Sequence, residues 1–208
     1  MAAAIRRGSV IRSSTTRKEC GRMSDLATPL NGRRAVGYVT VSEDAPRGMI
    51  SLRGDLSDGG IAEAVRAVTG ANLPEPLGLT AGEAGQVAWM SPDELLLFVA
   101  PNQTTDALTG LRSRLEGVHH LALDVTDMRA AFRLEGRGVR EVLAKVTPVD
   151  MQTLAPDTVR RTRLAQVAGA VWLSDEETAH VVCFSSVGTY VFDVLATSAA
   201  PGGEVGVF

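Results

Sequence analysis

The chain contains two copies of the same succession of segments, and this internal repeat constrains the fold more than any other feature. The first copy begins at MISLRGDL and continues through QVAWMSPDELLLFV; the second begins at AAFRLEGRG and continues through VAGAVWLSDEETAHVVCF. Gly54 and Gly136 end the two opening strands, 82 residues apart, and Trp89 and Trp172 precede two hairpin turns, 83 residues apart. We therefore predict that the two hairpins occupy equivalent positions in two similar halves around one shared core.

Hydrophobic periodicity and turn residues predict the elements of each half. In the first half we expect strands at 36–41, 49–53, 86–91, 95–100 and 120–125, a helix capped by Ser57 or Asp58 and closed by Gly70, a second helix between Thr104 and Gly117, and a loop at 71–85. In the second half we expect a strand at 132–135, a helix at 139–146, a strand through 160–163, a hairpin at 171–174 and 180–185, and a helix at 187–196. The prediction is an α+β fold with two pseudo-repeated β-α-β-β-α-β halves, 35–127 and 128–208, in one compact unit.

Charge is distributed unevenly along the chain. Residues 1–34 hold eight basic and two acidic residues, so that the remainder carries a net charge of −9 out of a total of −3. This basic, Ser/Thr-rich start is expected to be a disordered extension. Two alternatives are a targeting peptide and translation from Met23, which would leave residues 1–22 out of the protein.

Composition excludes several classes of function. The acidic body has no basic patch with interleaved aromatic residues, which argues against nucleic-acid binding. No apolar run approaches the roughly 20 residues that span a bilayer, so no membrane span is expected. The two cysteines, Cys20 and Cys183, lie in the extension and in an apolar strand. We expect no disulfide between them, which suits a reducing cytoplasm.

Side chains that could carry chemistry are few and scattered. His119 and His120 are adjacent, so on a strand they point to opposite faces and cannot both bind one metal ion. Cys183 lies in the apolar run VVCFS, where cysteine packs as a small hydrophobic residue. Gly136 and Gly138 open a helix after a strand, the place of a dinucleotide-binding loop, but the third glycine of that motif is missing. We therefore predict a structural role for each of these residues.

Two further groups of polar residues have side chains that could carry chemistry. Asp124, Asp127 and Arg129 cluster around a strand junction and could form an acid, a base and a counter-ion, although side chains in such turns more often bond local backbone amides.

Arg160, Arg161 and Arg163 alternate on a predicted strand, two on one face and one on the other, which favours a solvated edge or a partner contact. Trp89 and Trp172 are expected in the core or between the halves. We predict no catalytic, cofactor-binding or metal-binding residue in this chain.

Taken in order, several segments resemble the gamma subunit family of bacterial heterotetrameric sarcosine oxidase. They are RGMISLRGDL (47–56), WMSPDELLL (89–97), LDVTD (123–127), LEGRGVREVLAK (134–145) and PVDM (148–151). The resemblance runs from about Val41 to Ala199. The family usually has Cys-Pro-Leu-Asp where this chain has Thr147-Pro148-Val149-Asp150, and often more aromatic residues in the last helix. These departures leave open the equivalent subunit of an N-methylglutamate dehydrogenase complex.

The resemblance implies a function that the residues alone do not. Such complexes demethylate sarcosine to glycine, form hydrogen peroxide and transfer a one-carbon unit to tetrahydrofolate. Their FAD, FMN, NAD and zinc belong to the alpha, beta and delta subunits. The gamma subunit is similar in fold to folate-binding aminomethyltransferase domains. The implied role is that of a non-catalytic, cofactor-free structural subunit of this cytoplasmic oxidoreductase, with the alpha, beta and delta subunits as partners. A free-standing folate-binding or aminomethyltransferase-like protein is the alternative, with Asp124 and Arg129 as its first candidate pocket residues.

Overall fold

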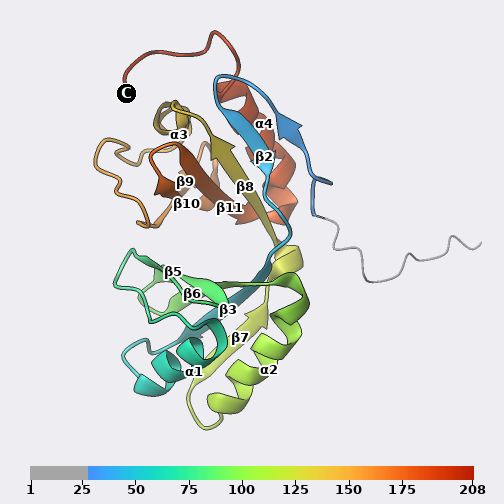
Figure 1. Cartoon of the computed structure of the whole chain (residues 1–208), viewed down its shortest axis with the longest axis vertical. Helices are drawn as coiled ribbons and strands as arrows, with labels where there is room; N and C mark the ends of the chain where they lie inside the picture. Colours follow the sequence, from blue (N-terminus) through green and yellow to red (C-terminus); the bar gives the residue numbers. More distant parts are fainter. Residues whose placement is uncertain (1–27) are drawn as a thin grey trace, which may run out of the picture.

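The computed structural model describes residues 28–208, so the expectations for residues 1–27, including a start at Met23, lie outside the described residues. The lower half of the molecule in Figure 1 contains, in chain order, β3 (Gly48–Gly54), α1 (Gly59–Thr69), β4 (Leu79–Ala81), β5 (Gly85–Ser91), β6 (Glu94–Val99), η1 (Pro101–Gln103), α2 (Thr104–Arg114) and β7 (His120–Asp124). Its five strands form an antiparallel sheet in the order β4-β5-β6-β3-β7. Both of its α-helices lie on one face of that sheet.

The upper half is built in the same way. It contains β1 (Arg34–Ala35), β2 (Thr40–Glu43), β8 (Arg129–Glu135), α3 (Val139–Val146), β9 (Arg160–Leu164), β10 (Val167–Asp175), β11 (Thr178–Phe184), η3 (Ser185–Val187) and α4 (Gly188–Ser198), and η2 (Thr126–Met128) joins the halves. Its six strands form an antiparallel sheet in the order β1-β2-β8-β11-β10-β9. The two sheets confirm the α+β class and the pseudo-repeat.

The N-terminal strands do not lie in the half that their position in the sequence suggests. In the lower sheet β3 pairs with β6 on one side and β7 on the other; in the upper sheet β8 pairs with β11 and β2. Thus β2 takes in the upper sheet the place that β7 takes in the lower one. Residues 34–43 therefore complete the sheet of the second half, whereas the expected division assigned residue 34 to the N-terminal extension and 35–43 to the first half.

Two local predictions are wrong. The strand expected at 36–41 is interrupted, because the backbone N–H of Tyr38 donates to the Ala199 carbonyl (3.0 Å) at the end of α4 instead of joining a sheet. The loop expected at 71–85 contains β4, which pairs with β5 at the edge of the lower sheet. Local composition cannot reveal such edge pairing, because the partner strand supplies the ladder hydrogen bonds.

The two tryptophans are not equivalent, although the hairpins are. Each hairpin has a two-residue loop and a bulge just before it, with Ser91 opposite Glu94 and Asp175 opposite Thr178. This register gives an offset of 84, so Trp172 is displaced by one residue from the position of Trp89. A shift of one residue on a strand turns a side chain to the other face. Trp89 accordingly packs against the helices of its own half, whereas Trp172 lies between the two sheets.

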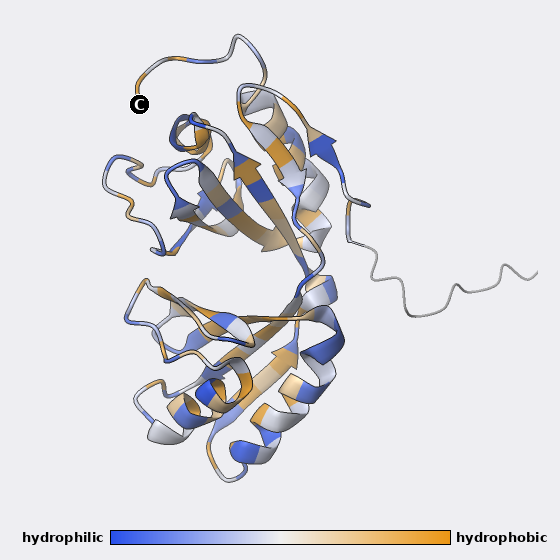
Figure 2. Ribbon diagram, in the orientation of Figure 1, coloured by the Kyte–Doolittle hydropathy of each residue, from blue (hydrophilic) through white to orange (hydrophobic). Residues whose placement is uncertain are grey.

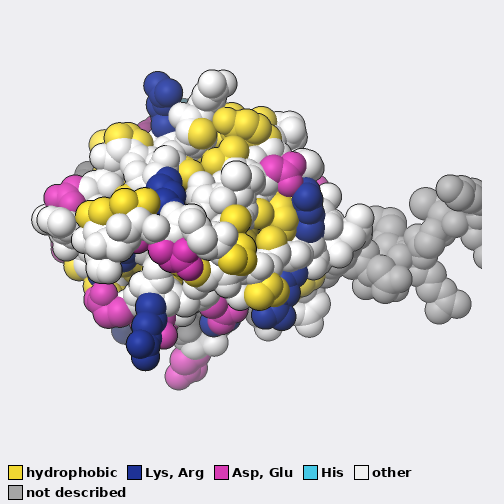
Figure 3. Space-filling view, turned by 90° about the horizontal axis from the view of Figure 1, so that it is seen from above, with side chains coloured by type: hydrophobic (Ala, Val, Ile, Leu, Met, Phe, Trp, Pro, Cys, Tyr) yellow, Lys and Arg dark blue, Asp and Glu magenta, His cyan; other side chains and the backbone are white. Residues whose placement is uncertain are grey.

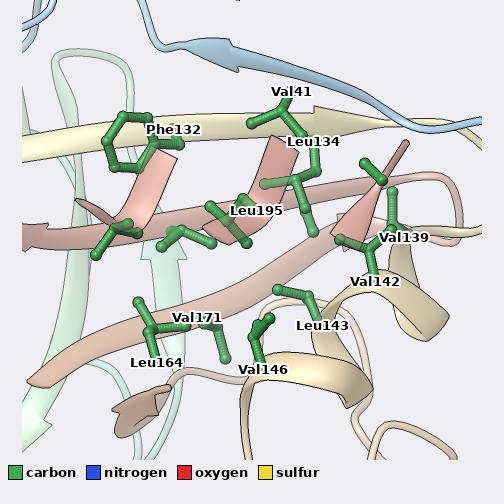
Figure 4. Close-up of a cluster of buried hydrophobic side chains, with 14 of the residues drawn as sticks. Val41, Phe132, Leu134, Val139, Val142, Leu143, Val146, Leu164, Val171 and Leu195 are labelled. Atoms are coloured by element: carbon green, nitrogen blue, oxygen red, sulfur yellow. The ribbon is translucent and has the colours of Figure 1, made fainter. Parts of the chain in front are cut away.

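Within residues 28–208, three hydrophobic clusters hold the two sheets and their helices together. One lies between the upper sheet and α3 and α4 and includes Phe132, Leu134 and Leu195 (Figure 4). The second lies between the lower sheet and α1 and α2. The third joins the helix-free faces of both sheets, where the Phe98 ring approaches the Trp172 ring at 5.7 Å. Hydrophobic and hydrophilic residues alternate along β8 in Figure 2, as expected for a strand with one face packed on the helices and the other partly exposed to solvent.

Helix α1 shows how the sequence sets its own boundaries. The Asp58 side chain accepts a hydrogen bond from the Gly60 N–H (2.7 Å) and caps the N-terminus, as predicted. Gly70 follows the helix with a φ of 74°, a left-handed conformation that favours glycine and stops the helix. The apolar stripe between these ends faces the lower sheet.

Candidate functional site

A hollow with a charged lining lies where the two halves join. It has a volume of about 310 Å³ and lies between the β2–β3 connection, η2, the start of β8 and η3. Its charged lining residues are Glu43, Asp44, Arg47, Asp127 and Arg129. The position follows from the fold, because the chain crosses from one sheet to the other at this junction.

Asp44 lines this hollow with 9% of its side chain exposed. Its carboxylate forms an ion pair with Arg47 (2.9 Å) and lies 3.6 Å from Nδ1 of His180, whose ring stacks on Trp172 with centroids 5.2 Å apart. Burial alone would raise the pKa of Asp44, but the contact with His180 and the charge of Arg47 outweigh it and hold that pKa below its usual value. Asp44 is therefore an ionised structural anchor and not a proton donor near neutral pH.

The three residues weighed as an acid–base set are only partly brought together. Asp127 and Arg129 both line the hollow. Asp124 does not line it: its carboxylate accepts a hydrogen bond from the Thr126 N–H (2.9 Å), as expected for a turn residue. Arg129 lies over the Phe184 ring at 4.3 Å, and its Nε is buried without a hydrogen-bond partner. Burial lowers the pKa of Arg129 from its usual value.

The other candidates have structural surroundings. Cys183 is fully buried under the upper sheet, and burial raises the pKa of its thiol to about 12, so the thiolate that nucleophilic attack requires is not formed near neutral pH. His119 is exposed, and the ring of His120 contacts the Val118 carbonyl (2.9 Å). A Cβ at Gly138 would lie 2.5 Å from the Tyr38 ring. The glycine turn thus allows close packing of the chain.

A buried glutamate that the sequence did not single out connects the two halves. Glu94 begins β6 and accepts hydrogen bonds from Ser51 (3.1 Å) and from two arginines, Arg53 of β3 (3.0 Å) and Arg161 of β9 (3.2 Å). Only 9% of its side chain is exposed. The sequence predicted Glu94 as a hairpin-turn residue. Its role in linking the sheets becomes visible only in the structure, where its side chain lies on the inter-sheet face of β6. Register confirms that Arg161 and Arg163 share one face of β9 and that Arg160 lies on the other.

Within residues 28–208, no group of three or more His, Cys, Asp or Glu side chains converges as metal ligands would. In the same part of the chain, none of the helices is both long and apolar enough to cross a membrane.

Comparison with known proteins decides the family. The sequence model of the sarcosine oxidase gamma subunit family matches residues 53–200. The chain belongs to this family. A heterotetrameric sarcosine oxidase from Corynebacterium sp. U-96, solved with pyrrole 2-carboxylate, contains a chain that is 26% identical, with a TM-score of 0.71 over 80% of this chain and 87% of that one. No curated protein sequence matches the chain.

The fold has a wider distribution than the family. Aminomethyltransferase T of the glycine cleavage system from Bartonella henselae is 10% identical, with a TM-score of 0.58 over 76% of this chain and 45% of that one. At this identity the likeness shows the fold alone. The likeness agrees with the predicted similarity to aminomethyltransferase-like folds. It does not identify any residue of this chain as a folate ligand.

A second buried glutamate of this gamma-family chain fixes the C-terminal segment. Glu141 of α3 accepts hydrogen bonds from the backbone N–H groups of Val205 (2.7 Å) and Gly206 (2.9 Å), and Lys145 donates to the Gly203 carbonyl (2.6 Å). Figure 3 views this end of the molecule and shows hydrophobic side chains exposed among charged ones.

We predict that this attachment responds to acid. The backbone hydrogen bond from Val205, with further help from Gly206 and Lys145, lowers the pKa of Glu141 from 4.5 to about 2. A carboxylate whose pKa is lowered by folding stabilises the attached segment fully above its unfolded pKa and loses this effect as pH falls toward its folded pKa. Amide hydrogen exchange at Val205 and Gly206 should therefore accelerate between about pH 4.5 and 2, after correction for the intrinsic rate. In Glu141→Gln the protection should be low at every pH; wild-type protection that does not change over this range would contradict the prediction.

Proposed function

We propose that this chain is the gamma subunit of a heterotetrameric sarcosine oxidase and acts in it as a non-catalytic structural subunit. The observation that carries the proposal is the family match together with the likeness to a chain of the Corynebacterium enzyme over most of both chains. Membership of an oxidoreductase complex then follows from the family, and the other subunits are its partners.

The buried acids of the chain support the structural role. Glu94 binds two arginines from different sheets, and Glu141 binds the C-terminal segment. Glu43 accepts hydrogen bonds from the Thr28 hydroxyl (2.6 Å) and the Leu30 and Gly32 amides (2.8 and 2.7 Å). The oxygens of these carboxylates are engaged by other segments of the same chain, so the three glutamates orient those segments.

In the proposed complex the alpha, beta and delta subunits carry FAD, FMN, NAD and zinc and convert sarcosine to glycine, with transfer of the one-carbon unit to tetrahydrofolate and formation of hydrogen peroxide. This chain would present a rigid surface to those subunits in the cytoplasm. Obligate interfaces of this kind bury extensive, largely apolar surface. The family resemblance supports the assignment of chemistry to the partners.

The test is to express the partner subunits with and without this chain. We expect the purified chain alone to be colourless and without oxidase activity, and omission of the chain to lower the yield of assembled complex more than the turnover of the complex that remains. A fully assembled, fully active complex without the chain would refute the structural role. Activity with N-methylglutamate in place of sarcosine would move the chain to the sister complex, and saturable folate binding by the isolated chain would favour the folate-binding alternative.

A further inference from the structure

Two leucines of strand β7 are exposed to solvent on the helix-free face of the lower sheet, which is the face toward the upper half. Leu121 and Leu123 are 50% and 42% exposed. They pair with Arg53 and Ser51 of β3, and Ser51 and Arg53 both bond Glu94 at the junction of the sheets. Directly paired residues lie on the same face of a sheet. The two leucines therefore extend the inter-sheet face beyond the part that the upper sheet covers.

The pseudo-repeat provides an internal comparison for this face. Next to the first hairpin loop, Arg53 of β3 pairs with Glu94 of β6. Next to the second, Glu135 of β8 pairs with Thr178 of β11, so Glu135 is the counterpart of Arg53. The counterpart of Leu121 is therefore Thr40, opposite Glu135, and the counterpart of Leu123 is Ser42, opposite Arg133. Where the second half has a threonine and a serine, the first half has two leucines. The fold does not require apolar side chains at these positions, so their presence on β7 needs another reason.

The apolar surface continues to the end of β11. Phe184 is 46% exposed and lies under the Arg129 guanidinium. Phe184, Arg129, Arg161 and Glu94 line one small depression of about 20 Å³ between the sheets. Since Glu94 also bonds Arg53, the depression and the β7 leucines belong to one continuous surface.

This surface is positively charged in an acidic protein. Residues 28–208 contain 15 basic and 22 acidic side chains. The surface nevertheless presents Arg53 and Arg161, whose side chains are 46% and 52% exposed, and the exposed Arg163 on the same face of β9. Glu94 and Asp93, which lies near Arg53 and Arg161, offset two of these three charges and leave one positive charge in excess. Exposed leucine and phenylalanine side chains bordered by arginines are typical of protein–protein interfaces, where aromatic residues and arginine are enriched.

We propose that the β7 face, defined as Leu121, Leu123, Phe184, Arg53, Arg161 and Arg163, is the surface through which this chain docks on a partner subunit. The matching surface presents apolar side chains flanked by carboxylates. This inference rests on the proposed function, because it takes the partner to be a subunit of the same complex. Complementary charge sets the orientation and rate of association, and burial of the leucines holds the bound state.

The test uses the full-length chain and its partner subunits, with a purification tag on a partner. The double variant Leu121→Thr/Leu123→Ser installs the residues that the second half already has at the equivalent positions, so it should fold normally, as circular dichroism can check. We expect its affinity for the partners to fall at least about tenfold. Val36→Ser removes an apolar side chain that is 72% exposed on the connection between β1 and β2, and should bind as wild type does. Arg163→Glu should slow association about threefold to tenfold at low salt, with a smaller effect at high salt.

The outcomes separate this inference from the proposed function. If the wild-type chain does not associate with the partner subunits, the proposed function fails. If the wild type associates and the double leucine variant binds equally well, the function stands and the β7 face is not the docking surface. If the leucines instead mediate self-association, the isolated wild type should be a dimer that the double variant abolishes without loss of partner binding, which would also overturn the inference.

Discussion

Replacement of Val41 by aspartate should unfold the second half of the molecule, although Val41 lies in a strand that precedes the entire first half in the sequence. Val41 is fully buried, pairs with Leu134 of β8 and lies in the cluster between the upper sheet and its helices (Figure 4). An aspartate there must bury an unpaired charge or become protonated. We expect the free energy of unfolding to fall by about 4 kcal/mol or more, which is the range of severe core substitutions.

The neighbouring residue provides a matched control. Ser42 lies on the same strand, one residue further on, so its side chain faces away from this core, and it pairs with Arg133. An aspartate at this position meets a positive charge and partial solvent, so Ser42→Asp should change stability by less than about 1 kcal/mol. Denaturant unfolding followed by circular dichroism measures both variants. Equal stability of Val41→Asp and the wild type would show that β2 is not an integral strand of the upper sheet.

The elements that the sequence predicted are those with local causes. Helix α1 has its cap at Asp58 and its stop at Gly70, and each hairpin has a turn flanked by alternating apolar residues. The position of β2 could not be predicted in the same way. Its pairing with β8 joins residues about 90 positions apart, and a strand of four residues with one apolar side chain, Val41, carries no signal that identifies its partner. The repeat made two halves predictable but not the exchange of a strand between them.

The site was predictable only in part for a related reason. The sequence brought attention to Asp127 and Arg129, which do line the hollow, but not to Asp44, which lines it beside them, or to Glu94, which forms ion pairs between the two sheets. Glu94 is bonded by arginines of two other strands, and Asp44 lies between Arg47 of its own connection and His180 of β11. A single charged residue beside a turn has the same local pattern whether it ends in solvent or between two sheets. The β7 leucines were likewise unremarkable until register identified their polar counterparts.

Removal of the Phe98 ring should weaken the contact between the halves and reveal whether they unfold as one unit. Phe98 is 3% exposed, and its ring packs against Trp172 across the sheets at 5.7 Å. Deletion of a buried phenylalanine side chain costs about 3–5 kcal/mol, because transfer free energy and packing are both lost. We expect Phe98→Ala to show this loss in denaturant unfolding. Phe184→Ala, which removes a ring that is 46% exposed, should cost no more than about 1 kcal/mol.

The way in which Phe98→Ala unfolds carries more information than the loss itself. The inter-sheet cluster draws residues from both halves, so if this contact couples them, the wild type should show one transition by every probe. Weakening the contact should separate the transitions, with Trp89 fluorescence reporting the lower half and Trp172 the upper half in variants that keep one tryptophan. A double-mutant cycle with Trp172→Leu isolates the aromatic pair, which we expect to contribute about 0.5–1.5 kcal/mol. Two separate transitions in the wild type would mean that the sheets fold independently and that the junction hollow forms by docking of two finished halves. A single transition in the wild type that divides into two in Phe98→Ala would have another meaning. It would show that the exchanged strand β2 and the inter-sheet cluster together make the repeat a single folding unit.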